Sequence, residues 1–281
     1  MKFAGIIAEY DPFHNGHAWQ LAQAKALGAE RVAVAMSCSL VQRGALPLLP
    51  EAVRTRSALT CGADLVFALP APCACAGAEA FARAGVALLA AAGCDGLVFG
   101  AETPDAALLM EAAELLDSGS YRAALKAQLA GGARSFAAAR QAAAAQLASD
   151  ERVAALLDKP NNNLAVEYCR AIRSLAPRME AYPLPRQGAD HGEALHSAHG
   201  QFASASALRK LWAEGGADAV APYVPEAVFP LYQEAYAAGQ YTDFSAAGRC
   251  ELALLRSACR DKAPFADIRG VSEGLEHRLE A

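Results

Sequence analysis

The sequence lacks several features that would assign it to particular protein classes. The 281-residue chain has no uninterrupted run of 18 or more apolar residues, so no membrane-spanning helix is expected. Eight cysteines are scattered without a C-x-x-C pair, which argues against a disulfide framework or a zinc site. Glu9 and Asp11 follow a short apolar run too closely for a signal peptide. These absences predict a cytoplasmic protein with no membrane partner and no metal held by its own side chains.

A basic excess is also missing, because the formal net charge is −5. This charge excludes a globally basic nucleic-acid binder, and DNA is not an expected partner, although net charge does not report a local basic face. Hydrophobic residues make up 54% of the chain and charged residues 20%. The composition therefore predicts a globular core in one large domain, or in one domain plus a smaller one.

Apolar runs and helical segments alternate over the first hundred residues. The runs predict strands at 3–8, 31–37, 63–70 and 94–100, and the intervening segments predict helices at 17–28, 51–62 and 77–93. The strand runs are continuously apolar rather than alternating, which is typical of a parallel sheet covered on both faces. We therefore predict an α/β fold with a Rossmann-like, doubly wound parallel sheet.

The pattern becomes mainly helical after residue 100. Residues 104–157 predict a helical insertion, a further helix starts after Pro160, a fifth strand covers 179–185, and a helix covers 202–216. We predict a nucleotidyltransferase-like domain at 1–221, including that insertion, and a helical C-terminal region at 222–281.

The loop after the first strand contains the sequence His14-Asn15-Gly16-His17. In a parallel sheet, ligands bind at the carboxyl ends of the strands, where this loop is expected. Gly16 allows close backbone approach, and the following helix start offers free N–H groups to a phosphate. Imidazoles three residues apart share one face and would donate to phosphoryl oxygens. The alternative is a surface turn with two solvated histidines.

Other polar residues follow predicted strands or begin predicted helices. They are Gln42 and Arg43, Gly100 and Glu102, Asn161 and Asn162, Arg186, and Ser204, Ser206 and Arg209. Arginines suit phosphate or carboxylate, and asparagine amides suit a base or a ribose. N-capping explains the serines and asparagines at helix starts equally well.

Six stretches in order carry a family resemblance. They are GIIAEYDPFHNGH, MSCSLVQRG, GADLVFALP, GLVFGAE, PNNNLAVEY and FASASALRK. Together they resemble the tRNA(Met) cytidine acetate ligase family of the HxGH nucleotidyltransferase superfamily. The resemblance implies that ATP activates acetate as acetyl-adenylate. The acetyl group then passes to N4 of the wobble cytidine in the anticodon of elongator tRNA(Met), which makes the chain an RNA-binding ligase.

The resemblance also implies roles for individual residues. His14 and His17 would act at the ATP phosphates, with Mg²⁺ accompanying the triphosphate. Independently of the resemblance, the position of Gln42 and Arg43 after the second strand predicts that they lie near the substrate. Gly100, Arg186 and one of Asn161 and Asn162 would contact the nucleotide. The ATP site would further be lined by residues of the first loop, namely Ile7, Ala8, Glu9, Tyr10, Pro12, Phe13, Asn15, Gly16 and Gln20.

The chain departs from the family pattern at several positions. Cys38 and Ser39 stand where the family has Gly-Asn, Glu51 replaces a lysine, and Asp11 replaces an asparagine. The family continues beyond position 281, so we expect either a fragment or a shortened member. Two other functions stay open: an adenylyl- or cytidylyltransferase acting on a small phosphate ester, and a nucleotide-binding protein without catalysis.

Overall fold

A computed structural model describes most of the chain. The described residues are 1–41, 44–132, 135–186, 195–197 and 200–260, together with residues 265, 268, 277 and 278. They divide into two compact units, Met1–Gln240 and Tyr241–Ala281. No helix among the described residues is long and apolar enough to cross a membrane.

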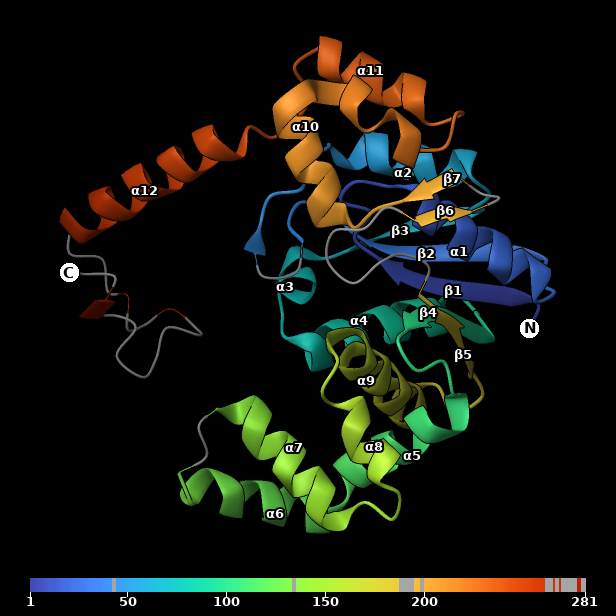
Figure 1. Ribbon diagram of the computed structural model, residues 1–281, viewed down its shortest axis with the longest axis vertical. Coiled ribbons are helices and arrows are strands. Elements are labelled where there is room, and N and C mark those ends of the chain that lie inside the picture. The colour runs from blue at the N-terminus through green and yellow to red at the C-terminus, as the bar shows by residue number, and fades with distance from the viewer. Residues whose placement is uncertain are drawn as a thin grey trace. The chain divides into compact units, whose positions relative to one another are not determined.

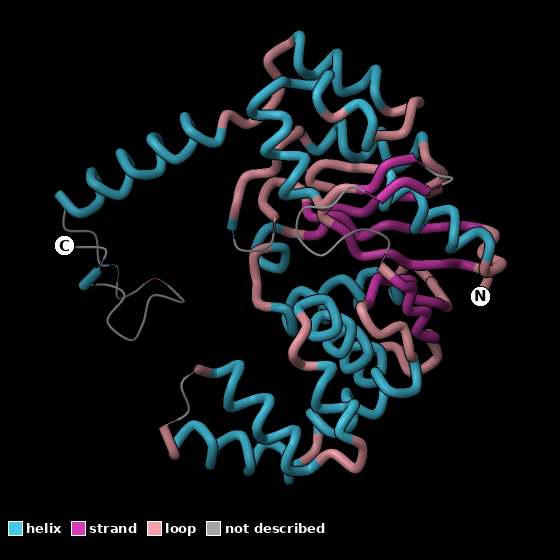
Figure 2. The backbone as a smooth tube through the Cα atoms, in the orientation of Figure 1, coloured by secondary structure: helices cyan, strands magenta, loops and turns pink. Residues whose placement is uncertain are grey.

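A five-stranded parallel sheet forms the centre of the first unit, as Figures 1 and 2 show. Its strands are β1 (Phe3–Ala8), β2 (Arg31–Ser37), β3 (Leu65–Leu69), β4 (Gly96–Ala101) and β5 (Glu180–Pro185). The spatial order is β3-β2-β1-β4-β5, with all neighbours parallel. The predicted α/β class and parallel sheet are confirmed. The chain reverses its winding direction between β1 and β4, which creates a crevice at their carboxyl ends.

Helices cover both faces of this sheet (Figure 1). One face carries α1 (Asn15–Ala26), α2 (Glu51–Thr60), α10 (Ala205–Ala219) and α11 (Phe229–Ala237). The other face carries α4 (Ala78–Ala91), α5 (Ala106–Asp117) and α9 (Pro160–Leu175). Each face has its own buried apolar cluster, so the central strands β1, β2 and β4 are buried on both sides, which explains their continuous apolar runs.

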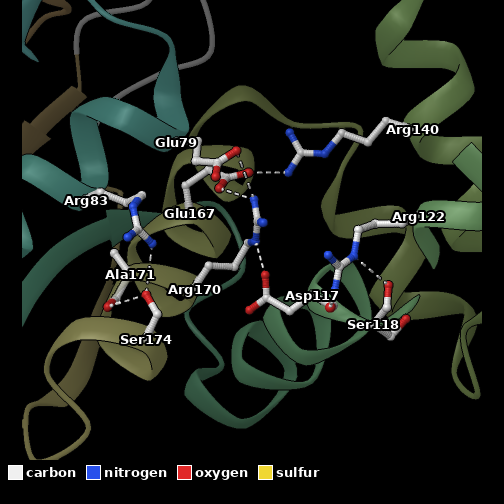
Figure 3. Close-up of polar contacts among 10 residues, drawn as sticks. All are labelled: Glu79, Arg83, Asp117, Ser118, Arg122, Arg140, Glu167, Arg170, Ala171 and Ser174. Carbon is white, nitrogen blue, oxygen red and sulfur yellow. Dashed lines mark hydrogen bonds and ion pairs between the residues drawn. The ribbon is translucent and has the colours of Figure 1, made fainter. Parts of the chain in front are cut away.

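The helices between residues 104 and 157 connect to α9 through charged contacts. These helices are α5, α6 (Gly119–Ala130), α7 (Phe136–Leu147) and α8 (Glu151–Leu156). Figure 3 shows Glu167 of α9 between Arg140 of α7, at 2.6 Å, and Arg170, at 2.7 Å. Arg170 also pairs with Asp117 at the end of α5, at 2.8 Å. The Glu167 side chain is only 4% exposed, so two guanidinium groups compensate a buried charge.

Several short elements were not expected from the sequence. They are α3 (Ala71–Ala74), the hairpin of β6 (Leu195–Ser197) and β7 (Gly200–Phe202), and the 3₁₀ helix η2 (Ala221–Tyr223). The second unit contains α12 (Phe244–Arg260), none of whose residues is buried. The first unit includes α11, and the domain boundary predicted after residue 221 stays a prediction.

Candidate active site

A cleft of about 360 Å³ opens at the carboxyl ends of β1 and β4. It lies at the position where parallel α/β sheets bind their ligands. Twelve of the residues predicted for the site line it: Ile7, Ala8, Glu9, Tyr10, His14, Gly16, His17, Gln20, Gly100, Asn161, Arg186 and Ser204. The structure therefore brings residues 7–20 together with residues more than 80 positions away.

The two histidines form a reciprocal cap at the start of α1. His14 is the N-cap residue, and its Nδ1 accepts the Gly16 N–H at 3.0 Å. The His14 N–H in turn donates to Nδ1 of His17 at 3.3 Å. The two rings stack with their centroids 3.8 Å apart. This cap starts α1 at Asn15, two residues before the predicted start, because the side chains satisfy N–H groups that the helix leaves free.

This cap determines where the imidazole protons lie. Because each Nδ1 accepts a backbone N–H, a neutral ring carries its proton on Nε2. Burial, with a contribution from Arg186, lowers the pKa of His14 to about 4. Burial also lowers the pKa of His17, and His14 and Arg186 lower it further. At neutral pH the pair therefore presents two uncharged Nε2–H donors at the start of a helix.

Tyr10 supports His17 from the preceding loop. It has a φ of 50°, the one positive φ of a non-glycine residue in the described ranges. The Tyr10 ring meets the His17 ring edge-on at 4.8 Å and the Phe13 ring at 4.9 Å. Its buried hydroxyl has no hydrogen-bond partner among the described residues. A left-handed bulky residue is strained, so the surrounding packing holds this loop in one conformation.

Arg54 of α2 holds together the backbone that surrounds the cleft. Its side chain has no exposed surface. The guanidinium donates to the carbonyls of Glu9 at 2.7 Å, Ser37 at 2.6 Å and Leu49 at 3.0 Å, and also to that of Cys38. Glu9 follows β1 and Ser37 ends β2, so one side chain fixes the carboxyl ends of two neighbouring strands.

A carboxylate and two asparagines position the start of α9. Glu102 accepts the N–H groups of Asn161 at 3.2 Å and Asn162 at 2.6 Å, so it caps this helix. The Asn161 side chain donates to Glu102 at 2.6 Å and accepts from Arg186. Asn162 is 1% exposed and bonds to Thr103 through both ends of its amide. Asn161 therefore lies at the cleft and Asn162 does not, and nucleotide binding by either residue stays a prediction.

Comparisons with known proteins agree with this geometry. The profile of the family described as HIGH Nucleotidyl Transferase matches residues 1–281. The tRNA(Met) cytidine acetate ligase of Syntrophotalea carbinolica is 36% identical over 99% of this chain, and that of Caldanaerobacter subterraneus subsp. tengcongensis is 34% identical over 99%. The chain belongs to the tRNA(Met) cytidine acetate ligase family, within the HIGH nucleotidyl transferases. It spans 66% and 69% of the lengths of these two relatives.

Solved structures show the same relationship to this ligase family. The chain matches Thermotoga maritima TmcAL bound with alpha-thio ATP with a TM-score of 0.85 and 30% identity, covering all of this chain and 66% of that one. It matches the apo form of the same protein with a TM-score of 0.86 and 31% identity, covering 67% of that chain. The predicted family and fold are therefore confirmed.

In this member of the ligase family, the Arg209 side chain contacts Asp11 and does not line the cleft. Its position at a helix start predicted a contact with phosphate. Instead its Nη1 donates to the backbone carbonyl of Asp11 at 2.7 Å and pairs with the Asp11 carboxylate at 3.1 Å. Asp11 also accepts the Leu48 N–H at 2.6 Å and is 4% exposed. Burial raises the Asp11 pKa, and Leu48 and Arg209 oppose that shift. The Asp11 carboxylate is thus matched by a neighbouring cation.

Other predicted residues support the cleft without lining it. The Asn15 amide donates to the carbonyls of Gln201 and Pro222 and so joins α1 to β7 and η2. Phe13 is fully buried, and its carbonyl accepts the Tyr232 hydroxyl. The residues predicted for the site that lie outside the lining are Pro12, Phe13, Asn15, Glu102, Asn162, Ser206 and Arg209. Phe13 is instead packed in the core, and Asn15, Glu102, Asn162 and Arg209 instead contact partners in segments distant in sequence.

Two lining residues also have structural contacts. Gln20 donates from its Nε2 to the Val98 carbonyl of β4 at 3.1 Å and so links α1 to the neighbouring strand. Ser204 is the N-cap of α10, with its Oγ accepting the Ala207 N–H at 3.2 Å, and it lies 3.0 Å from the Ser206 Oγ. Ser204 therefore caps α10 and also lines the cleft, so its contact with a phosphate stays a prediction. Gln42 and Arg43, predicted for the substrate, lie outside the described residues.

Ten of the lining residues were not predicted from the sequence. They are Asp11, Trp19, Phe81, Phe99, Leu164, Tyr168, Leu184, Pro185, Ala203 and Ala205. Most are apolar and lie on helices or strands, where their pattern is that of core residues. For Leu184 and Pro185 the position at the end of a predicted strand was a usable signal. For Phe81 and Tyr168, only the packing of α4 and α9 against the sheet shows that these side chains line the cleft.

Proposed function

We propose that this chain uses ATP to activate acetate as acetyl-adenylate and transfers the acetyl group to N4 of the wobble cytidine of elongator tRNA(Met). The observation that carries the proposal is the His14–His17 pair, whose two Nε2–H groups lie beside a helix start in the switch-point cleft. The proposal also draws on the family to which the chain belongs, because its named relatives are tRNA(Met) cytidine acetate ligases.

ATP fits the groups that line this cleft. Gly16 and the positive dipole end of α1 suit phosphates. Gly100 leaves open backbone, since an added Cβ there would meet only the Arg186 Cγ at 3.5 Å. Asn161 and Arg186 supply an amide and a guanidinium for the nucleoside or its phosphates.

Mg²⁺ fits as an ion carried by the triphosphate. Among the described residues, no three side chains of histidine, cysteine, aspartate or glutamate gather as a metal site. Mg²⁺ in such sites is bound mainly by phosphate oxygens and water, with at most one or two carboxylates, and it neutralises charge on the phosphates. Glu9 is a carboxylate of the cleft lining that would assist.

The first step is a displacement at the α-phosphorus. A carboxylate oxygen of acetate bonds to that phosphorus, and the bond to the pyrophosphate oxygen breaks, with no net proton transfer. The two histidines would donate from Nε2 to phosphoryl oxygens as charge develops on them, while the loop held by Arg54 aligns the reactants. In the second step, the N4 amine of cytidine attacks the acyl carbon, AMP leaves, and N4 loses a proton.

No protein nucleophile is needed in either step. Burial raises the pKa of the Cys38 thiol to about 11, and Glu51 adds to the shift. Burial raises the pKa of Cys61 to about 11 and that of Cys169 to about 12. These thiols are therefore protonated and unreactive at neutral pH. We further propose that residues 1–221 form the ATP-binding domain and that the protein acts in the cytoplasm.

The test is acetate-dependent exchange of pyrophosphate into ATP, followed by transfer of labelled acetate to unmodified tRNA(Met). We expect both activities. Asn161→Ala should raise the KM for ATP, because it removes the partner of Arg186. Asn163→Ala is the matched control, since this neighbour bonds only to the Leu157 and Lys159 carbonyls in the described structure. Exchange with a phosphate ester but not with acetate would contradict the proposal. ATP binding without any exchange would also contradict it.

A further inference from the structure

The cleft has an apolar wall that the proposed mechanism does not use. We define this acyl wall by Ile7 of β1, Phe81 of α4, Phe99 of β4, and Leu164 and Tyr168 of α9. The histidines come from α1 on the opposite face of the sheet (Figure 1). A ligand across the ends of β1 and β4 would therefore have polar donors on one side and aromatic rings on the other.

We propose that the acyl wall binds the non-polar group of the carboxylic acid substrate, and that Phe81 and Tyr168 restrict this group to a very short chain. This inference rests on the proposed function, because it concerns the acid that ATP would activate. It adds the residues that discriminate between carboxylic acids of different chain length. The polar half of the cleft does not distinguish these acids.

The packing of α4 brings Phe81 to the end of β1. A Cβ on Gly85 would lie 2.5 Å from the Ile7 Cδ1, so the helix backbone presses directly on this strand. Phe81 lies one turn before Gly85. In a right-handed strand–helix–strand unit the helix runs antiparallel to the strands, so this turn lies toward the carboxyl end of β1. The close contact at Gly85 also prevents α4 from moving inward or tilting freely.

Tyr168 closes the wall between β1 and β4. Its ring lies 5.4 Å from the Phe99 ring, at an interplanar angle of 56°. Burial raises its pKa, and the nearby Glu9 raises it further, so the phenol is neutral and close to the residue that follows β1. Tyr168 thus faces the same strand ends as the phosphate-binding loop.

The wall is rigid enough to select by size. Phe81 and Phe99 are each 3% exposed and Tyr168 is 4% exposed, and all three belong to one buried cluster. Well-packed interiors do not admit an extra methylene without strain. One methylene in such a pocket typically changes specificity about 10- to 200-fold. A wall of this kind favours acetate over propionate and butyrate.

The acyl wall has two alternative roles: it contacts the adenine base of ATP, or it is only part of the hydrophobic core. The residues suited to the nucleoside, Gly100, Asn161 and Arg186, lie at the ends of β4 and β5 and the start of α9. Phe81 packs instead beside β1. If the wall faced the base, truncating Phe81 would raise the KM for ATP. If it were only core, truncation would lower stability and leave the choice of acid unchanged.

The experiment measures acid-dependent pyrophosphate exchange with acetate, propionate and butyrate in the full chain. Phe81→Ala and the milder Phe81→Leu and Tyr168→Leu are compared with Leu88→Ala, which removes an apolar side chain from the same helix outside the cleft. We expect the ratio of kcat/KM for butyrate to that for acetate to rise about tenfold or more in the Phe81 variants. Leu88→Ala should leave this ratio unchanged.

The outcomes separate the two proposals. If the unaltered protein exchanges with acetate but the ratio stays within about twofold in all three wall variants, the acyl wall is refuted and the proposed function stands. An increased KM for ATP with an unchanged ratio also refutes it. If the unaltered protein exchanges with no acid, the proposed function fails, and this inference fails with it.

Discussion

Replacing Arg54 with methionine should destabilise the protein by about 3–5 kcal/mol. The side chain is fully buried and donates to four backbone carbonyls, those of Glu9, Ser37, Cys38 and Leu49. A hydrogen bond from a charged donor contributes about 1.5–3 kcal/mol, and each buried acceptor left without a donor carries its own desolvation cost. Removing the buried charge recovers part of its desolvation cost, so the net loss is smaller than the sum of four bonds.

The assay is urea unfolding followed by circular dichroism. With a slope of about 2–3 kcal/mol per molar urea, the midpoint should fall by about 1–2.5 M. Arg56→Met is the matched control on the same helix, because its side chain is 61% exposed and pairs with Glu234 only at 3.8 Å. This control should change stability by less than about 0.5 kcal/mol.

A second measurement tests the role of Arg54 at the cleft. Arg54→Lys retains the charge but cannot reach four carbonyls in one plane, so it should recover only part of the stability. Pyrophosphate exchange should fall in both variants, even at temperatures where the protein stays folded, because the Glu9 and Ser37 carbonyls lose their shared donor. A stability loss below about 1 kcal/mol in Arg54→Met would refute the reasoning.

Three further predictions concern charge and close contact. The low pKa of His14 means that the unfolded chain binds more protons than the folded one between about pH 6.5 and pH 4, so stability should fall by about 2 kcal/mol from pH 7 to pH 5 through this residue. His14→Asn keeps an N-cap and should flatten this dependence in urea unfolding; an unchanged slope would contradict it. Gly16→Ala should lower the rate of pyrophosphate exchange at least tenfold, because the new Cβ would lie 2.9 Å from the His14 ring. Gly119→Ala is the control, because a Cβ there meets open space, and it should leave the exchange rate unchanged. Glu167→Gln should lower the free energy of unfolding by about 1–3 kcal/mol, because Arg140 and Arg170 lose a buried partner but remain partly solvated. Faster proteolysis within residues 104–157 would show this loss, and an unchanged rate of proteolysis would contradict it.

Element types were predictable from the sequence because their signals are local. Strand β1 at 3–8 and strand β2 at 31–37 have the predicted bounds, since a buried parallel strand needs a continuous apolar run. Helix α1 was placed two residues late, because a histidine is an unusual N-cap and its side-chain bond to Gly16 is not visible in a pattern. The β6–β7 hairpin was missed because each strand has only three residues.

The sequence by itself determined the sheet class, the loop with His14 and His17, and the family to which the chain belongs. Only the tertiary structure decided which predicted residues reach the cleft. Asn161 and Asn162 are adjacent and chemically identical, yet one meets Arg186 and the other Thr103. Spacing along the chain specifies which way a helix or strand presents its apolar face. The partner of a polar side chain depends instead on contacts between segments distant in sequence, which form only when the sheet and its two helical layers pack together.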